Sequence, residues 1–184
     1  MQIILASASP RRHELLAAAG IAFTVHAPDI DETLDPAWTP EHAARELACQ
    51  KAEAVAALYP DACVIAADTI VVIDGEILGK PVDEADAVRM LHLLSGREHT
   101  VFTGVCMQRG EHKTVFAQQT QVQFYALSDD EITRYVATGE PMDKAGAYGI
   151  QGRGAVLVQG IVGDFYNVMG LPIAQVVREL RYFS

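Results

Sequence analysis

The chain is poor in cations, and this shortage restricts the partners it can bind. Among its 184 residues, 14 are Lys or Arg and 24 are Asp or Glu, which gives a formal net charge of −10. A surface of that sign repels nucleic-acid backbones and anionic membranes, so broad, salt-dependent binding of either is excluded. A small polyanion remains compatible only if several of the few cations gather at one place.

Cysteine and long apolar runs are also scarce. The three cysteines, Cys49, Cys63 and Cys106, contain no CxxC pair and cannot all pair within one chain. This argues against a disulfide framework or a zinc ribbon and favours a reducing compartment. No apolar run approaches the roughly 20 residues that span a bilayer, and the first residues lack the basic segment of a signal peptide. We therefore expect a cytoplasmic protein.

Several common catalytic motifs are incomplete. Residues 75–81 resemble a Walker A loop, but the stretch is one residue too short and lacks the Ser or Thr that binds Mg²⁺. Residues 152–154 begin a dinucleotide fingerprint, yet Leu157 stands where the third glycine belongs. The six histidines show neither HExxH spacing nor a triad with a GxSxG elbow. The sequence thus lacks support for P-loop, Rossmann, zinc-protease or acyl-hydrolase chemistry.

Strand and helix signals alternate along the chain. We expect strands, where apolar and β-branched residues concentrate, over residues 3–6, 62–73, 99–107, 114–124 and 155–162. We expect helices, most of them opened by Ser, Thr or Asp at the N-cap, over residues 10–19, 40–58, 84–94, 129–139 and 172–182. Hairpin signals at Asp74-Gly75 and near residue 110 accompany the crossovers. The pattern predicts an α/β fold with a mixed sheet, built as a single domain over residues 1–184.

Two arginines stand where a helix tolerates cations poorly. Arg11 and Arg12 open the first expected helix, where the macrodipole makes a cation unfavourable by about a few tenths of a kcal/mol or more. With the hydroxyls of Ser7 and Ser9 and the unpaired backbone N–H groups of a helix start, this place suits a phosphate or carboxylate. The alternative is that both arginines are solvated or paired with acids such as Glu14.

Lys51 and Asp68 are charged residues in apolar surroundings. Lys51 falls in the middle of the apolar stripe of the second expected helix, so its ammonium must extend outward or meet an anion. Asp68 interrupts the most apolar strand, where Asp is rarely buried without a partner. A carboxylate at the end of a central strand can hold a divalent cation or orient a water. The alternative is a structural Asp, satisfied by backbone N–H groups or paired with Lys51 or Lys80.

Three further places offer chemistry of lower specificity. Glu32 lies in an acidic turn that could supply a metal ligand or simply be solvated. Lys80, just before a proline, lies in a rigid loop that could present its ammonium to phosphate. The stretch over residues 139–170 holds eight of the fourteen glycines, which suits a binding loop or a bulged hairpin. It includes Lys144 and also Gln151, whose amide can read the edge of a base.

Taken together, these motifs resemble the Maf family of nucleoside triphosphate pyrophosphatases over nearly the whole chain. The resemblance rests on five stretches in the family's order: 5–12 (LASASPRR), 28–32 (PDIDE), 67–69 (ADT), 79–81 (GKP) and 143–152 (DKAGAYGIQG). It implies metal-dependent cleavage of a nucleoside triphosphate to the monophosphate and pyrophosphate. It also implies an elongated mixed sheet flanked by helices, with two lobes around a central cleft. The chain is most similar to the branch acting on dTTP and UTP, because the 7-methyl-GTP branch differs at the positions of Thr69 and Gln151.

The resemblance and the unusual residues together give each expected role. Asp68 would be the general base, and Glu32 with Asp68 would hold Mg²⁺ or Mn²⁺. Arg12, Thr69 and Gln151 would discriminate the pyrimidine. The expected phosphate-binding residues are Ser7, Ser9, Arg11, Lys51, Lys80 and Lys144. The family also implies a homodimer; the alternatives are a 7-methyl-GTP or broader noncanonical triphosphate pyrophosphatase, or a nucleotide-binding regulator of septation.

Overall fold

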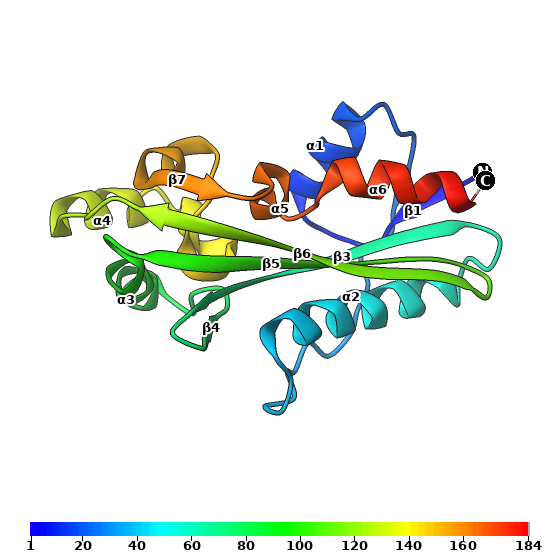
Figure 1. The fold of residues 1–184 in the computed structure, drawn as a ribbon, viewed down its shortest axis with the longest axis horizontal. Helices are drawn as coiled ribbons and strands as arrows, with labels where there is room; N and C mark the ends of the chain where they lie inside the picture. Colours follow the sequence, from blue (N-terminus) through cyan, green and yellow to red (C-terminus); the bar gives the residue numbers. More distant parts are fainter. Residues whose placement is uncertain (184) are drawn as a thin grey trace. The chain divides into compact units, whose positions relative to one another are not determined.

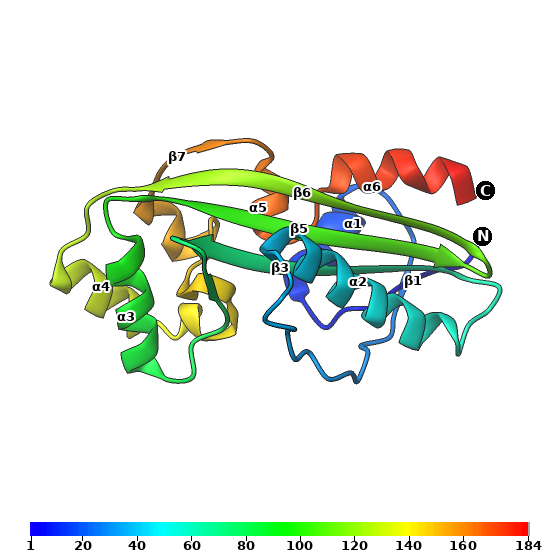
Figure 2. The same ribbon diagram turned by 60° about the horizontal axis from the view of Figure 1, so that its bottom comes forward.

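The chain forms a mixed β-sheet flanked by helices, as a computed structural model shows (Figure 1, Figure 2). The structure describes residues 1–183. The strands are β1 (Ile3–Leu5), β2 (Thr24–Val25), β3 (Cys63–Ile73), β4 (Glu76–Leu78), β5 (Glu98–Arg109), β6 (His112–Phe124) and β7 (Val158–Val162). Their order is β2-β1-β3-β5-β6-β7, with β4 paired to β3. β1 runs parallel to β2 and β3, whereas β4 and β7 pair antiparallel with their neighbours, so the predicted mixed α/β class is confirmed.

One or two strands precede each of the first four α-helices along the chain, and the last two α-helices follow the last strand. The α-helices are α1 (Pro10–Ala18), α2 (Pro40–Ala56), α3 (Glu84–Leu94), α4 (Asp129–Val136), α5 (Phe165–Met169) and α6 (Ile173–Glu179). Four 3-10 helices accompany them: η1 (Glu140–Asp143), η2 (Ala145–Ala147), η3 (Gly152–Leu157) and η4 (Leu180–Phe183). Within residues 1–183, no helix has both the length and the apolar character needed to cross a membrane.

The described residues form two compact units. Unit 1 comprises residues 1–69, 103–118 and those from Gly170 onward, and unit 2 comprises residues 70–102 and 119–169. Three strands, β3, β5 and β6, contribute residues to both units. The chain enters unit 2 twice, so no single cut separates the units, which agrees with the absence of a linker in the sequence. The single domain over the whole chain stays a prediction.

In unit 1, α2 covers one face of the sheet, and α1 and α6 lie on the other face (Figure 1, Figure 2). The core beneath α2 is made mainly of small and β-branched side chains: Ile4, Ala6, Ala48, Cys49, Ala52, Val55, Ala56, Ala62, Val64, Ala66 and Cys106. Alanine side chains on the helix permit a short distance between its backbone and the strands. The composition of α2 therefore favours close packing on the sheet.

Most helix starts follow the signals read from the sequence. Thr39 Oγ1 accepts the N–H of His42 at the start of α2, and Asp83 Oδ1 accepts the N–H of Asp86 at the start of α3. At α4, Ser128 and its third following residue, a Glu, form the complete capping box. These three N-terminal boundaries are confirmed to the residue because each depends on a local hydrogen bond.

Some expected boundaries are wrong. The strand expected from residue 155 begins at Val158, because the 3-10 helix η3 precedes it. The helix expected to reach Leu58 ends at Ala56, and Leu58 is 62% exposed. The last α-helix ends at Glu179, where η4 continues the chain. Neither β2 nor α5 is among the expected elements, because two and five residues are too few to show a period.

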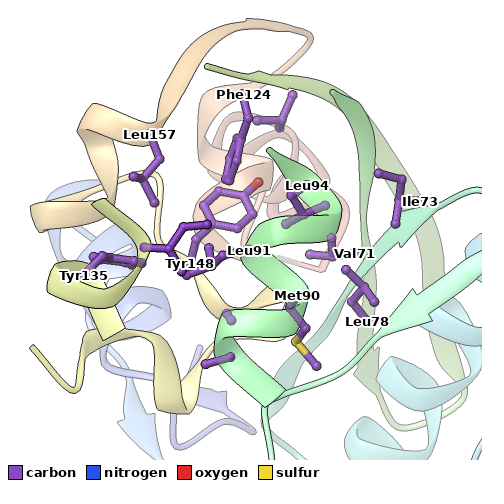
Figure 3. Close-up of a cluster of buried hydrophobic side chains, with 14 of the residues drawn as sticks. Val71, Ile73, Leu78, Met90, Leu91, Leu94, Phe124, Tyr135, Tyr148 and Leu157 are labelled. Atoms are coloured by element: carbon purple, nitrogen blue, oxygen red, sulfur yellow. The ribbon is translucent and has the colours of Figure 1, made fainter. Parts of the chain in front are cut away.

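The core of unit 2 anchors the glycine-rich segment (Figure 3). Tyr148 of that segment lies among the side chains of Leu91, Leu94 and Phe124. The ring nitrogen Nε2 of His99 lies 2.8 Å from Tyr148 Oη. The Phe124 ring packs edge-on against both, with ring centroids 5.0 Å from His99 and 4.7 Å from Tyr148. The glycine-rich segment is thus fixed to a buried aromatic cluster.

The buried His99 predicts a loss of stability in acid. Burial lowers the pKa of His99 to about 4, whereas the pKa of a histidine in the unfolded chain is about 6.5. Between these pH values the histidine is protonated in the unfolded chain but neutral in the folded chain. The free energy of unfolding therefore falls as the pH falls, by on the order of 3 kcal/mol in total. Urea unfolding at several pH values measures this slope. His99→Gln should flatten it, whereas His92→Gln, at an exposed histidine, should not; equal slopes in all three proteins would contradict the prediction.

Candidate active site

A buried ammonium lies between two carboxylates in unit 1. Lys51 Nζ is 2.6 Å from Asp68 Oδ1 and 2.9 Å from Glu32 Oε1. The side chains of Lys51 and Asp68 are 9% and 12% exposed, whereas that of Glu32 is 55% exposed. The group is therefore enclosed at Asp68 and open to solvent at Glu32. Three residues that the sequence assigns to one site do come together, and Lys51 meets anions rather than extending outward.

The close approach of α2 to β5 sets the position of this lysine. An added Cβ at Gly104 would lie 2.2 Å from Ala44 O and 2.5 Å from Arg45 N, closer than real Cβ atoms come. Ala44 and Lys51 are seven residues apart, about two helical turns, so they lie on the same face of α2. Gly104 therefore lets this face reach the sheet, where Lys51 contacts Asp68 on the neighbouring strand β3.

Arg12 joins segments that are distant in the sequence. Its Nη1 donates to Ser7 Oγ at 3.1 Å, its Nη2 to Thr69 Oγ1 at 3.1 Å, and its Nε to Gly170 O at 2.7 Å. Thr69 Oγ1 in turn lies 2.9 Å from Thr103 Oγ1. Two residues expected to read the base, Arg12 and Thr69, are thus directly hydrogen-bonded.

The Arg12 guanidinium also lies in the field of both carboxylates. Burial lowers the pKa of Arg12, while the negative charges of Asp68 and Glu32 act in the opposite direction. A guanidinium nonetheless stays protonated at neutral pH, so the cation persists. Its donors go to hydroxyls and a carbonyl rather than to Glu14, the partner considered from the sequence. Arg11 is close enough to contribute a further lowering, which shows that the two cations share one region.

The start of α1 is organised differently from the expected cap. Ser9 occupies the N-cap position, but its side chain makes no capping hydrogen bond. Its backbone N–H donates instead to Ser7 Oγ at 3.2 Å, and His13 Nε2 lies 2.8 Å from Ser7 O. Ser7, which is 5% exposed, therefore orders this turn, and the Ser9 hydroxyl is not used by the cap.

The two carboxylates suit a divalent cation only as part of a ligand set. In the described part of the chain, no group of three or more His, Cys, Asp or Glu side chains could hold a metal ion. Mg²⁺ is commonly bound through one or two carboxylates, waters and substrate phosphates rather than by a cage made of protein alone. Glu32 and Asp68, which both contact Lys51 Nζ, lie close enough together to supply the carboxylates of that kind of ligand set.

The other expected residues, Lys80, Lys144 and Gln151, lie in unit 2. Lys80 and Gln151 are exposed. Lys144 Nζ is held by Glu140 O at 2.6 Å and by Asp143 Oδ1 at 2.7 Å. A backbone hydrogen bond of 3.0 Å ties the loop before Lys80 to the glycine-rich segment. These three residues therefore belong to one unit, and the residues around Asp68 belong to the other.

Two residues in these networks carry no signal that singles them out in the sequence. Thr103 is fully buried in β5, where a threonine is an ordinary strand residue. Glu140 follows a glycine after α4 and reads as a solvated acid, yet its carboxylate accepts hydrogen bonds from the backbone of the glycine-rich segment. Its one indication in the sequence is its position before a run of glycines, whose N–H groups need acceptors.

Comparison with known proteins identifies the family. A family model described as Maf-like protein matches residues 2–183. The chain belongs to the Maf family. The match covers every stretch on which the resemblance rests, so the recognition made from the motifs is confirmed. Since the family model runs through both units, the residues of unit 1 and unit 2 belong to one family sequence.

Relatives of this Maf chain are similar over its full length. A dTTP/UTP pyrophosphatase from Symbiobacterium thermophilum is 54% identical over 100% of this chain and 94% of its own. Proteins of the same name from Bacillus cytotoxicus and Bacillus pumilus are 50% and 52% identical, over 100% of this chain and 96% and 97% of theirs. Among solved structures, the Ham1 protein of Staphylococcus aureus has a TM-score of 0.50 at 18% identity, covering 67% of this chain and 72% of that one. This last likeness is one of fold alone.

Proposed function

We propose that the chain hydrolyses dTTP and UTP to the monophosphate and pyrophosphate, with water attacking the α-phosphorus. The observation that carries the proposal is the buried Asp68, held by Lys51 and lying near Glu32 and Arg12. The names of the relatives at 54%, 50% and 52% identity support the choice of the two substrates.

Asp68 acts as the general base in this proposal. Lys51 contacts its Oδ1 at 2.6 Å, which orients the carboxylate and leaves Oδ2 to accept a proton from the attacking water. A positioned general base contributes about 10²- to 10⁴-fold to such a step. The pairing with Lys51 is also the contact that the structural alternative predicts, and in this proposal the same contact orients the carboxylate.

The cations stabilise charge on the triphosphate. Attack at the α-phosphorus places negative charge on the phosphoryl oxygens and the leaving pyrophosphate, which fixed positive groups stabilise. We assign phosphate binding to the polar and cationic residues named from the sequence, namely Ser7, Ser9, Arg11, Lys51, Lys80 and Lys144. Glu32 and Asp68 would hold Mg²⁺ or Mn²⁺, which when bound supplies further positive charge to the phosphates.

Base selection is assigned to Arg12, Thr69 and Gln151. Arg12 and Thr69 are hydrogen-bonded at 3.1 Å, so a guanidinium and a hydroxyl are offered together in fixed geometry. The exposed Gln151 amide has one donor and one acceptor group, which matches the alternating donor and acceptor of a uracil or thymine edge. Once the bound substrate covers these polar groups, a wrong base leaves them unpaired, and this gives such a site its selectivity.

A panel of triphosphates tests the proposed activity. The protein, with Mg²⁺ and then with excess chelator, is given dTTP, UTP, CTP, GTP and 7-methyl-GTP, and pyrophosphate and orthophosphate are measured separately. We expect pyrophosphate from dTTP and UTP at the highest rates and no turnover with chelator. Orthophosphate as the first product would contradict attack at the α-phosphorus. Nucleotide affinity without turnover would favour the regulatory alternative instead.

Gln151→Glu should reduce selectivity more than stability. The carboxylate lacks the amide donor, so we expect kcat/KM for dTTP to fall by about 10- to 100-fold. The denaturation midpoint should stay within experimental error, because Gln151 is exposed. Gln159→Glu, at an exposed position of β7, is the matched control and should change neither value. An unchanged ratio of dTTP to 7-methyl-GTP rates would reject a role of Gln151 in reading the base.

The assembly and compartment also remain proposals. The family resemblance implies a homodimer, and the composition predicts the cytoplasm. Analytical ultracentrifugation of the purified chain measures the first, and fractionation of the producing cell measures the second.

A further inference from the structure

The carboxylate of Glu140 is bound to the backbone of the glycine-rich segment. Its Oε2 accepts the N–H of Arg153 at 3.0 Å, and its Oε1 accepts the N–H of Gly154 at 3.0 Å. The same Oε1 lies 3.0 Å from Tyr135 Oη. Desolvation favours the protonated acid, but these three hydrogen bonds outweigh it and hold the pKa of Glu140 below its usual value. The side chain is therefore an ionised acceptor for three donors.

Tyr135 extends this contact to the other end of the same loop. Its hydroxyl donates to Glu140 and accepts the N–H of Gly149 at 3.1 Å. The ring of Tyr135 is 6% exposed and belongs to the core of unit 2, where Figure 3 shows it on α4. Burial raises the pKa of Tyr135, so the hydroxyl keeps its proton and remains a donor. Glu140 and Tyr135 thus hold residues 149–154 at both ends.

The space around residues 149–154 is also restricted, as an added Cβ at two of the glycines shows. An added Cβ at Gly152 would lie 2.8 Å from Glu140 Oε2, and Gly152 has a φ of +65° that favours glycine. An added Cβ at Gly154 would lie 2.1 Å from Gly149 O and 2.7 Å from Tyr135 Oη. The glycines therefore let the backbone fold tightly around one carboxylate.

Gln151 lies in the middle of this loop and is exposed. No hydrogen bond of its side chain occurs among residues 1–183, so within the chain it is the backbone that sets the region its amide can reach. That backbone is fixed on one side through Gly149 and on the other through Arg153 and Gly154. A loop held in this way fixes the point from which the Gln151 side chain extends, so binding need not also order the backbone there.

We propose that Glu140 is a positioning residue for base selection, which acts by fixing the loop that presents Gln151. This inference rests on the proposed function, since it deepens the role of Gln151 in that reaction. In this role Glu140 contacts no reacting atom, and its main effect is on which base the site accepts. The same residue holds Lys144 through its backbone carbonyl, a contact that a change of side chain leaves in place.

Glu140→Gln is the direct test. The amide offers one acceptor oxygen, and its NH₂ faces donor N–H groups, so the loop loses at least one anchor. We expect the ratio of kcat/KM for dTTP to that for 7-methyl-GTP to fall about 10-fold or more, mainly through KM. The pH profile of kcat should not change. Asp130→Asn, which removes an exposed carboxylate from α4, is the matched charge control and should leave the ratio unchanged.

A second background separates positioning from general support of the fold. In a Gln151→Ala protein, Glu140→Gln should reduce selectivity no further, because the residue it positions is gone. Equal losses of kcat/KM for both substrates, or an undiminished effect in the Gln151→Ala background, would overturn the proposal. If Glu140→Gln fails to fold, Glu140→Asp, which keeps the charge with a shorter reach, replaces it in the same comparison.

Amide hydrogen exchange reports on the loop without using turnover. Glu140→Gln should accelerate exchange at Gly149, Arg153 and Gly154, while the amides of α3 remain protected. Unchanged protection would overturn the proposal even if selectivity shifts. A wild-type protein that releases no pyrophosphate would instead overturn the proposed function and the selectivity role with it, so the two failures are distinguishable.

Discussion

Asp68→Asn should lower pyrophosphate release from dTTP by about 10³-fold or more while the protein keeps its fold. The amide cannot take a proton from water at neutral pH, so the variant loses the general base and one of the two carboxylates proposed to hold the metal ion. The side chain keeps its size at a position where only 12% of it is exposed. Its oxygen can still accept from Lys51, and Glu32 remains as the second partner of the ammonium at 2.9 Å.

Two measurements separate chemistry from stability in this variant. Denaturation curves and near-ultraviolet circular dichroism should show a folded protein, and single-turnover kinetics should show the chemical step slowed. Asp61→Asn, at an exposed carboxylate of unit 1, is the matched control and should retain full activity. Turnover by Asp68→Asn within 10-fold of the wild type would remove Asp68 from the role of general base.

The residues around Asp68 could be found from the sequence because each violates a rule of burial or helix electrostatics. Asp68 interrupts an apolar strand, Lys51 interrupts an apolar helical stripe, and Arg12 opposes the helix dipole. Each violation requires a compensating partner. The structure supplies them as the ion pair of Lys51 with Asp68 and the hydrogen bonds of Arg12 to Ser7 and Thr69.

Partners supplied by distant backbone could not be found in the same way. The carbonyl of Gly170 that accepts from Arg12 is 158 residues away along the chain, and a carbonyl has no side chain to mark it. Glu140 carries the charge of a solvated surface acid, and its use as an acceptor depends on the fold of residues 149–154. The helix and strand propensities of the sequence cannot predict either contact, because both form only when the tertiary structure brings distant residues together.

The positions of the charged residues change what the net charge implies about the ligand. The formal charge of −10 argues against an extended polyanion, yet the cations Arg11, Arg12 and Lys51 all belong to unit 1. Of the surplus acids, Glu32 and Asp68 lie against Lys51 and orient it. A compact triphosphate, whose charges occupy a few ångströms, is the polyanion that such a local group can bind. The net charge therefore restricts how large an anionic ligand can be, but a small anionic ligand remains compatible with it.

Gly104→Ala should lower the free energy of unfolding more than an alanine at any other glycine of unit 1. The new Cβ would lie 2.2 Å from Ala44 O and 2.3 Å from Ala44 C, and both atoms belong to the backbone of α2. Backbone cannot rotate away as a side chain can, so helix and strand must separate. We expect the free energy of unfolding to fall by at least about 3 kcal/mol, at the upper end of the usual cost of overpacking.

The same substitution should also lower turnover, because α2 carries Lys51 about two turns beyond Ala44 on the same face. Moving that face away from β5 lengthens the 2.6 Å contact between Lys51 and Asp68, so kcat should fall even in the folded fraction. Gly160→Ala, at a strand glycine with no atom within 4 Å of the added Cβ, is the matched control and should be neutral or slightly stabilising. Urea denaturation of both variants measures the difference, and a loss below about 1 kcal/mol for Gly104→Ala would show that α2 does not rest on β5 as closely as its position implies.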